Sequence, residues 1–157
     1  MKEREYYPAL KKALKEYLER DNTATVQLAI TSNKIPEWVK SGWDDVTAYA
    51  ALVTKKKPDI MGYLQSKNEH NIRKLLSVEF KVGELNFEDI YQLKMYAELF
   101  DSDLNYLIST EPVNSDLKRF LEKRRGVLAV RAAYYQIEIF MLGPTVDGEY
   151  MLIPVNI

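Results

Sequence analysis

Three ionisable residues of this chain, Asp59, Glu79 and Lys81, lie in or directly beside apolar segments. Residues two apart on a β-strand face the same side of a sheet, so a strand over residues 75–82 presents Glu79 and Lys81 side by side. An acid and a base in an apolar run are costly unless they pair or bind something. Asp59 comes directly before a second apolar segment, Ile60–Leu64. Two carboxylates and a lysine can together hold and use a divalent cation, which is the layout of a metal-dependent phosphodiesterase.

The same residues allow a plainer interpretation, in which Glu79 and Lys81 form a structural pair on an edge strand and Pro58-Asp59 is a turn signal. The order of the segments favours the chemical interpretation. A strand beginning at Ile60 is followed by a polar turn over 65–71, and the strand with Glu79 and Lys81 is the return arm. The two acidic residues then come from neighbouring strands.

The chain has 157 residues, of which 46% are hydrophobic and 29% charged. This length and composition predict one domain over residues 1–157, with a buried core. No apolar stretch approaches the length needed to span a bilayer, and the charged start, Met1–Glu5, is unlike a signal peptide. We therefore expect an intracellular, cytoplasmic protein with no membrane partner.

The residue types that are missing narrow the chemistry further. There is no cysteine and there is one histidine, His70. Disulfides, zinc–thiolate sites, thiol nucleophiles and multi-histidine metal sites are thereby excluded. His70 lies in a polar turn, which indicates an exposed residue rather than a catalytic base. The six glycines form no phosphate-binding loop, so no nucleotide cofactor is expected. Carboxylates, lysine and a metal ion remain for catalysis.

Three short motifs follow one another along the chain: Pro58-Asp59, Glu79-Phe80-Lys81, and Gln92 with Tyr96. In order and spacing they resemble the PD-(D/E)XK nuclease superfamily, over about residues 3–110. The last motif is similar to the Gln-xxx-Tyr signature of the exonuclease and helicase-nuclease branch of that superfamily. The resemblance implies a restriction-endonuclease-like fold and a deoxyribonuclease that hydrolyses phosphodiester bonds with Mg²⁺, for which Mn²⁺ is a substitute.

Asp59 and Glu79 are the expected metal ligands, because Mg²⁺ takes few protein carboxylates and keeps several of its waters. A backbone carbonyl from Phe80 or Val82 could complete the shell. Lys81 would orient or help deprotonate the attacking water, or stabilise the charge that develops on the phosphate. The sequence does not separate these roles.

Gln92 and Tyr96 are four residues apart and so share one helix face. The resemblance implies that Gln92 takes part in catalysis and that Tyr96 supports it or contacts DNA. In such proteins an additional acidic metal ligand often comes from the first helix. We expect this ligand to be Glu5; the alternatives are Glu3, Glu16 and Glu19.

A formal net charge of −1 provides no general attraction to nucleic acid, so DNA binding requires local basic patches. Five residues flank the proposed site in sequence and are expected to bind DNA: Lys55, Lys56, Lys57, Arg73 and Lys74. A further basic cluster comprises Lys118, Arg119 and residues 123–125. Exonuclease or endonuclease action, the strandedness of the DNA and the formation of a homodimer stay open.

Two other classes of protein also stay open. One is a non-catalytic DNA-binding module that uses the basic clusters, although no helix-turn-helix, zinc-finger or basic-zipper pattern supports it. The other is a protein-interaction module on the same fold, with Trp38 and Trp43 as exposed anchors. Packing is the plainer role for both tryptophans.

The expected fold class is α/β, or α+β by some definitions, with a mixed central sheet flanked by helices. The expected core order is α-β-β-β-α-β, followed by a C-terminal α-β-β. Residues 46–53 would suit a helix or a strand, and we expect a helix. The predicted helices cover residues 3–20, 36–39, 44–51, 86–100 and 115–126; the predicted strands cover 25–31, 60–64, 75–82, 104–108, 127–142 and 150–155.

Overall fold

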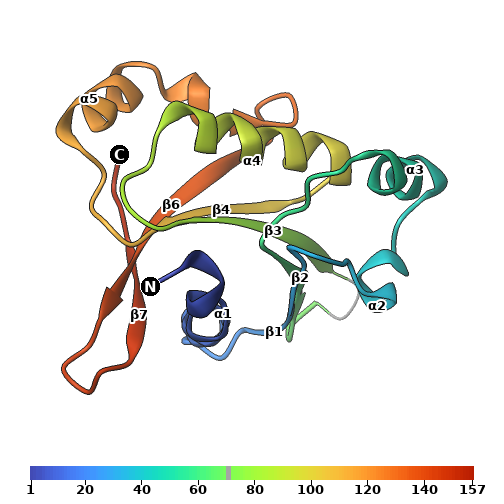
Figure 1. The fold of residues 1–157 in the computed structure, drawn as a ribbon. Helices are drawn as coiled ribbons and strands as arrows, with labels where there is room; N and C mark the ends of the chain where they lie inside the picture. Colours follow the sequence, from blue (N-terminus) through green and yellow to red (C-terminus); the bar gives the residue numbers. More distant parts are fainter. Residues whose placement is uncertain (70–71) are drawn as a thin grey trace.

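The computed structural model describes residues 1–69 and 72–157, and over these residues it forms a mixed seven-stranded sheet flanked by helices. The strands follow the spatial order β1-β2-β3-β4-β6-β5, and β7 pairs with β6 (Figure 1). Their bounds are β1 Ala24–Ile30, β2 Ile60–Ser66, β3 Arg73–Lys81, β4 Leu104–Ser109, β5 Ala129–Val130, β6 Tyr135–Pro144 and β7 Tyr150–Pro154. The predicted fold class is confirmed.

Helices cover both faces of this sheet, with α1 on one face and α4 on the other (Figure 1). α2 and α3 lie between β1 and β2 in the sequence, and α5 leads into a short 3-10 helix, η1. Their bounds are α1 Glu3–Leu18, α2 Glu37–Lys40, α3 Asp45–Val53, α4 Phe87–Phe100, α5 Ser115–Lys123 and η1 Arg125–Leu128.

Two hydrophobic cores result, one on each face of the sheet. On the α1 side, Leu10 and Leu14 pack against alternate residues of β3, including Leu76 and Val78. On the α4 side, Leu93 and its neighbours pack against the other set of strand residues. Alternation along a strand produces this division, because successive side chains point to opposite faces.

Strand direction changes in the middle of the sheet. β2 is antiparallel to both of its neighbours, β1 and β3, whereas β3, β4 and β6 are parallel. The register places Ile60 opposite Val78 and Lys81 beside Ser109. Asp59, the residue just before β2, therefore lies beside the C-terminal end of β3, which contains Glu79 and Lys81.

β1 and β2 approach each other closely at Gly62. A Cβ atom added there would lie 2.0 Å from the Gln27 carbonyl oxygen. A side chain at this position would therefore force the two strands apart, which explains a glycine within a β-strand.

The C-terminal region differs from the expectation of one strand over 127–142. The structure has η1, the short strand β5, and then a turn in which Arg131, Ala132 and Ala133 all have positive φ. Arg131 fixes this turn, because its guanidinium bonds Asp101 at 2.7 Å and Asp103 at 2.8 Å. The helix predicted over residues 115–126 is α5, and its N-terminal cap is Asn114, whose side chain accepts a hydrogen bond from the Leu117 N–H.

Both tryptophans pack against the α4-side core rather than standing out as exposed anchors. The Trp43 ring stacks on Phe100 with centroids 5.6 Å apart. His70 lies outside the residues that the structure describes. Within the described ranges, no helix is long and apolar enough to cross a membrane.

Candidate active site

Asp59 is held rigidly where β2 begins. Its Oδ2 accepts a hydrogen bond from the Phe80 backbone N–H at 2.7 Å, and its Oδ1 accepts one from the Tyr7 hydroxyl at 2.6 Å. The residue is 6% exposed. The carboxylate thus bonds across to β3 and to α1, and joins three elements that are far apart in sequence.

Glu79 lies next to Asp59 on β3 and is 9% exposed. Burial, reinforced by the negative charge of Asp59, raises the pKa of Glu79 to about 10. Two adjacent carboxylates in a poorly solvated place cannot both ionise cheaply, so one proton stays between them. The pair is therefore neutralised by a proton when no other cation occupies that place.

Gln92 of α4 reaches this pair from the opposite side of the sheet from α1. Its Nε2 donates to Glu79 Oε2 at 3.4 Å and to the Tyr96 hydroxyl at 3.0 Å. Gln92 and Tyr96 lie on one face of α4, as their spacing of four residues predicts. Gln92 thus joins the carboxylate pair, and the structure brings Asp59, Glu79 and Gln92 together as expected.

The first helix contributes Glu3 and Tyr7 to the same group. The Tyr7 hydroxyl lies 3.0 Å from Glu3 Oε1 as well as 2.6 Å from Asp59. A hydroxyl carries one proton, so Tyr7 can donate to one of the two carboxylates at a time, and the contact with Asp59 is the shorter. Partial burial and the charge of Asp59 raise the pKa of Glu3 above its ordinary value.

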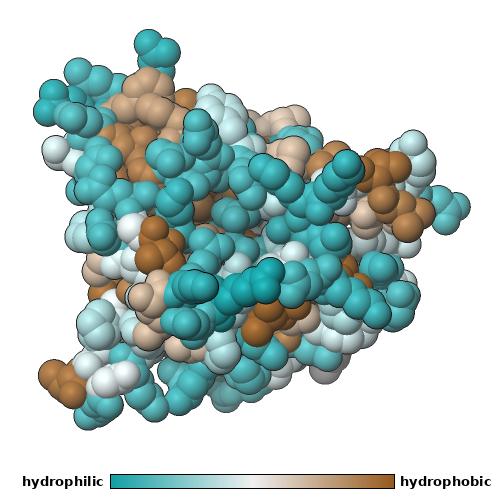
Figure 2. All heavy atoms as spheres, viewed as in Figure 1, coloured by the Kyte–Doolittle hydropathy of each residue, from teal (hydrophilic) through white to brown (hydrophobic). Residues whose placement is uncertain are grey.

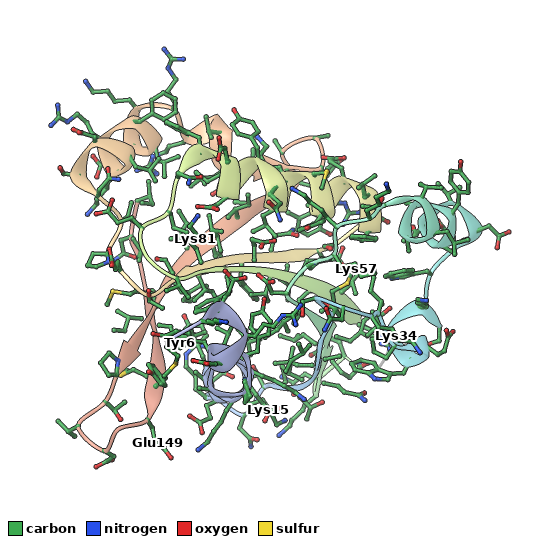
Figure 3. The ribbon with its side chains drawn as sticks, in the orientation of Figure 1. Tyr6, Lys15, Lys34, Lys57, Lys81 and Glu149 are labelled. Atoms are coloured by element: carbon green, nitrogen blue, oxygen red, sulfur yellow. The ribbon has the colours of Figure 1, made fainter. Side chains whose placement is uncertain are left out.

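Lys81 lies at the edge of the group, at the end of β3 (Figure 3). Its Nζ is 3.7 Å from Asp89 Oδ1, and its side chain is 37% exposed. The plainer interpretation, a Glu79–Lys81 pair on an edge strand, is wrong, because Lys81 contacts Asp89 and β3 lies between β2 and β4 in the sheet. Asp89 also accepts a hydrogen bond from the Asn86 N–H at 2.8 Å, so it is fixed by the N-terminal cap of α4. The ammonium is thereby kept beside the carboxylate pair without being buried in it.

Glu5, the expected third metal ligand, lies away from the group. It is exposed, and its Oε2 accepts a hydrogen bond from the Lys2 backbone N–H at 3.1 Å as part of the N-terminal cap of α1. Glu3 stands nearest the pair instead. The helical stripe that buries Tyr7, Leu10 and Leu14 passes through position 3 and not through position 5.

Tyr96, expected among the DNA contacts, is fully buried and cannot touch a bound strand. Burial, with the nearby Glu79 charge, raises the pKa of its hydroxyl to about 12, so it stays protonated and holds Gln92. Tyr96 is therefore a supporting residue.

Two of the expected DNA-binding residues lie far from the carboxylates. Arg73 and Lys74 open β3, and six residues of strand separate Arg73 from Glu79, which is roughly 20 Å at the usual rise. The Arg73 guanidinium also covers the Tyr63 ring at 3.6 Å. Lys55, Lys56 and Lys57 instead lie in the loop that leads directly into Asp59, where Lys55 and Lys56 are exposed and Lys57 is half-buried (Figure 3).

The donors of the group suit a hard cation. Among residues 1–69 and 72–157 no three His, Cys, Asp or Glu side chains form a ready-made metal cage. Asp59 and Glu79 nevertheless offer two carboxylates that already share a proton, and a divalent cation could take that proton's place. Mg²⁺ needs only one or two protein carboxylates beside its waters. Asp59 and Glu79 would be the residues that hold it.

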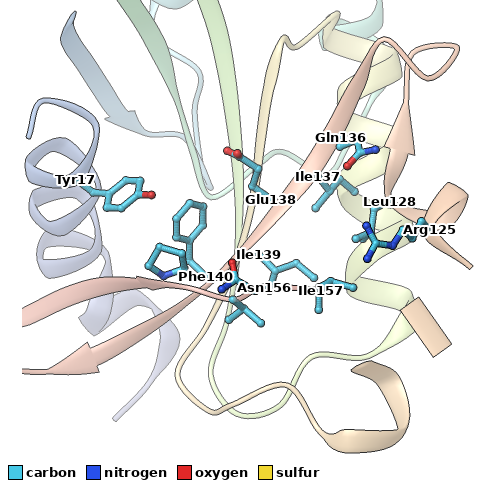
Figure 4. Close-up of a pocket in the computed structure, with 12 residues that line it drawn as sticks. Tyr17, Arg125, Leu128, Gln136, Ile137, Glu138, Ile139, Phe140, Asn156 and Ile157 are labelled. Atoms are coloured by element: carbon cyan, nitrogen blue, oxygen red, sulfur yellow. The ribbon is translucent and has the colours of Figure 1, made fainter. Parts of the chain in front are cut away.

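A separate pocket of about 260 Å³ lies on β6, away from this group. Tyr17, Arg125, Glu138 and Asn156 are among its polar lining residues (Figure 4). Neither Asp59 nor Glu79 lines this pocket. Its lining includes one base, Arg125, and one acid, Glu138, with no second acid beside them. The candidate site is therefore placed where β2 begins and β3 ends.

No protein-family model, curated protein or solved structure matches the chain.

Two residues of the site, Tyr7 and Asp89, were not expected from the sequence. The spacing of Glu3 and Tyr7 on one helix face, and the position of Asp89 in the first turn of α4, were the available signals. The functional assignment depends on the geometry of these side chains.

Proposed function

We propose that the protein is a Mg²⁺-dependent deoxyribonuclease of the PD-(D/E)XK type, with a restriction-endonuclease-like core. The observation that carries this proposal is the buried Asp59–Glu79 pair, with Lys81 at its edge and Gln92 bonded to Glu79. Two buried carboxylates side by side oppose folding unless a cation uses them, so their presence argues for a function.

The ion, when bound, lowers the pKa of a coordinated water and neutralises charge on the phosphate. Asp59 is held for this task by the Phe80 N–H and the Tyr7 hydroxyl, so its carboxylate has a fixed position, and each oxygen has a further lone pair for a cation. Gln92 orients Glu79. Lys81 brings an ammonium group to the open side of the pair, where it can orient the attacking water or stabilise the phosphate charge.

DNA is the proposed partner, and Lys55, Lys56 and Lys57 are the proposed phosphate contacts nearest the site. Their loop joins α3 to Asp59, so a strand held there lies close to the carboxylates. A homodimer would suit cleavage of both strands. We infer a cytoplasmic protein, in a compartment where DNA and millimolar Mg²⁺ occur together.

Cleavage assays test the proposal directly. Purified protein with Mg²⁺ or Mn²⁺ should cleave plasmid, linear duplex or single-stranded DNA, and EDTA should abolish this cleavage. Asp59→Asn and Glu79→Gln should each remove activity, whereas Glu122→Gln, an exposed acid on α5, should retain it. Cleavage that persists in Asp59→Asn, or that needs no metal, would contradict the assignment.

A second candidate is a non-catalytic DNA-binding module on the same fold. The contact between Lys81 and Asp89, rather than between Lys81 and the carboxylate pair, favours it. DNA binding without cleavage under every metal tested would support this alternative over the first.

A further inference from the structure

An aromatic pair, exposed Phe87 and half-buried Phe120, lies near the candidate site, where α4 begins and α5 passes over it. The rings of Phe87 and Phe120 meet edge to face, with centroids 4.8 Å apart. Phe87 is 43% exposed. The pair lines a groove of about 440 Å³ together with Leu85, Asn86, Asn114, Asp116 and Leu117.

Cationic side chains gather on the other side of Phe120. Arg119, Lys123 and Arg124 line a second hollow of about 320 Å³, which also includes Asp116. The Arg124 guanidinium lies 5.6 Å from the centroid of the Phe120 ring. Figure 2 shows apolar atoms between hydrophilic ones at the upper left, over α5. Phe120 thus separates an apolar groove from a positively charged hollow, and three cations outweigh one acid.

This surface follows directly from the catalytic strand. The loop after Lys81 runs through residues 82–86 to Phe87, and the Gly83 N–H donates to the Thr110 hydroxyl at 2.8 Å. Asn114, which caps α5, lies 3.5 Å from Glu84 of the same loop. A DNA strand that leaves the Asp59–Glu79 pair and passes Lys81 would therefore meet the groove next.

We propose that the groove binds an unpaired nucleotide, whose base stacks on the exposed Phe87 ring while its phosphates contact Arg119, Lys123 and Arg124. Aromatic faces beside cations are the usual means of holding single strands, since every base has a π-face. Paired bases in a duplex present no free face to such a platform. The inference rests on the proposed nuclease function and names its substrate class: single-stranded DNA, or DNA with an unpaired end.

Binding by fluorescence anisotropy in EDTA tests this apart from cleavage. The probes are a labelled oligothymidylate and a labelled duplex. Phe87→Leu keeps the apolar contact with Phe120 but loses the π-face, so it should weaken binding of the single strand about 5- to 100-fold. Phe87→Tyr should retain wild-type affinity, and the duplex should respond to neither variant.

One control variant and one further test variant complete the experiment. Tyr134→Leu removes an aromatic ring that is 85% exposed on the β5–β6 turn, and it should leave binding unchanged. Arg124→Gln should lower the salt slope for the single strand by roughly 0.7, the value for one phosphate contact. Equal losses for duplex and single strand in Phe87→Leu, or no loss for either, would overturn the platform, and so would an unchanged slope in Arg124→Gln.

Binding in EDTA tests the aromatic platform, and cleavage with metal tests the proposed nuclease function, so each can be rejected without the other. A platform confirmed in EDTA, in a protein that cleaves no DNA with Mg²⁺ or Mn²⁺, would leave single-strand binding in place and remove the nuclease assignment. Metal-dependent cleavage with a platform that binds nothing would do the reverse.

Discussion

Replacing Glu79 by glutamine should stabilise the metal-free protein at neutral and alkaline pH. The folded state holds the Glu79 proton much more tightly than the unfolded chain does, because burial and Asp59 raise its pKa from 4.5 to about 10. This carboxyl therefore disfavours folding progressively as the pH rises from about 4.5 toward 10. A glutamine amide can donate to Asp59 as the protonated acid does, and it never ionises.

The size of the effect follows from that shift. Each pKa unit is worth ~1.4 kcal/mol, so between pH 4.5 and pH 7.5 the penalty reaches roughly 4 kcal/mol. Sharing of the proton with Asp59 and rearrangement around the pair reduce it, and we expect Glu79→Gln to gain about 1–3 kcal/mol at pH 7.5. The gain should shrink to nearly nothing at pH 5.

Urea denaturation in EDTA, followed at pH 5, 6.5 and 8, measures this difference. Glu122→Gln provides the matched control, since its side chain is exposed and the change removes the same charge. Added Mg²⁺ should reverse the order at pH 8, because an ion that binds only the folded wild type stabilises it by mass action. The reasoning would be refuted if Glu79→Gln were less stable than wild type in EDTA at pH 8. It would also be refuted if the difference in free energy of unfolding between the two proteins did not change with pH.

Four further outcomes can be measured. Tyr7→Phe removes the 2.6 Å hydrogen bond to Asp59 and should cost about 1–2 kcal/mol in urea denaturation; unchanged stability would contradict the role of that hydroxyl. Lys81→Ala should lower the cleavage rate by ~10²–10⁴ while calorimetry still detects metal binding, and a wild-type rate would remove Lys81 from the mechanism. Changing Lys55, Lys56 and Lys57 to glutamine should weaken DNA affinity similarly across sequences, with roughly one unit of salt slope lost per phosphate contact; a full slope would mean that the strand runs elsewhere. Gly62→Ala should destabilise the fold by about 3 kcal/mol, because its Cβ would meet the Gln27 oxygen, whereas Gly126→Ala meets nothing within 4 Å and should be tolerated.

Local patterns were sufficient for most of the helices and strands. A helix was predicted over residues 86–100, and in α4 the regularly spaced Ile90, Leu93, Ala97 and Phe100 form the buried face while Asn86 caps the N-terminus. These features depend on residues within a few positions of one another, which is why the sequence reveals them. The hairpin of β2 and β3 follows for the same reason.

Long-range pairing and side-chain direction could not be predicted in this way. The turn at 131–133 has positive φ at residues that are not glycine, and it depends on ion pairs between Arg131 and acids of a distant segment. At the site, the order of the strands predicted that Asp59 and Glu79 could meet, and the resemblance to PD-(D/E)XK nucleases implied that Gln92 would join them. It did not reveal that Lys81 turns to Asp89, since that contact depends on where α4 starts relative to β3.

The packing of α1 has a consequence for the timing of synthesis. α1 lies against both β1 and β7, through contacts such as the Tyr6 ring with the Tyr150 ring at 5.7 Å and Lys12 with Glu149 at 3.1 Å. A ribosome makes α1 long before it makes β7, so the helix waits for its second partner. Until that partner arrives, α1 lacks its contacts with Glu149 and Tyr150 and is held by its other contacts alone. A nascent chain would therefore contain β2 and β3 before the helix that brings Tyr7 to Asp59 is fully packed.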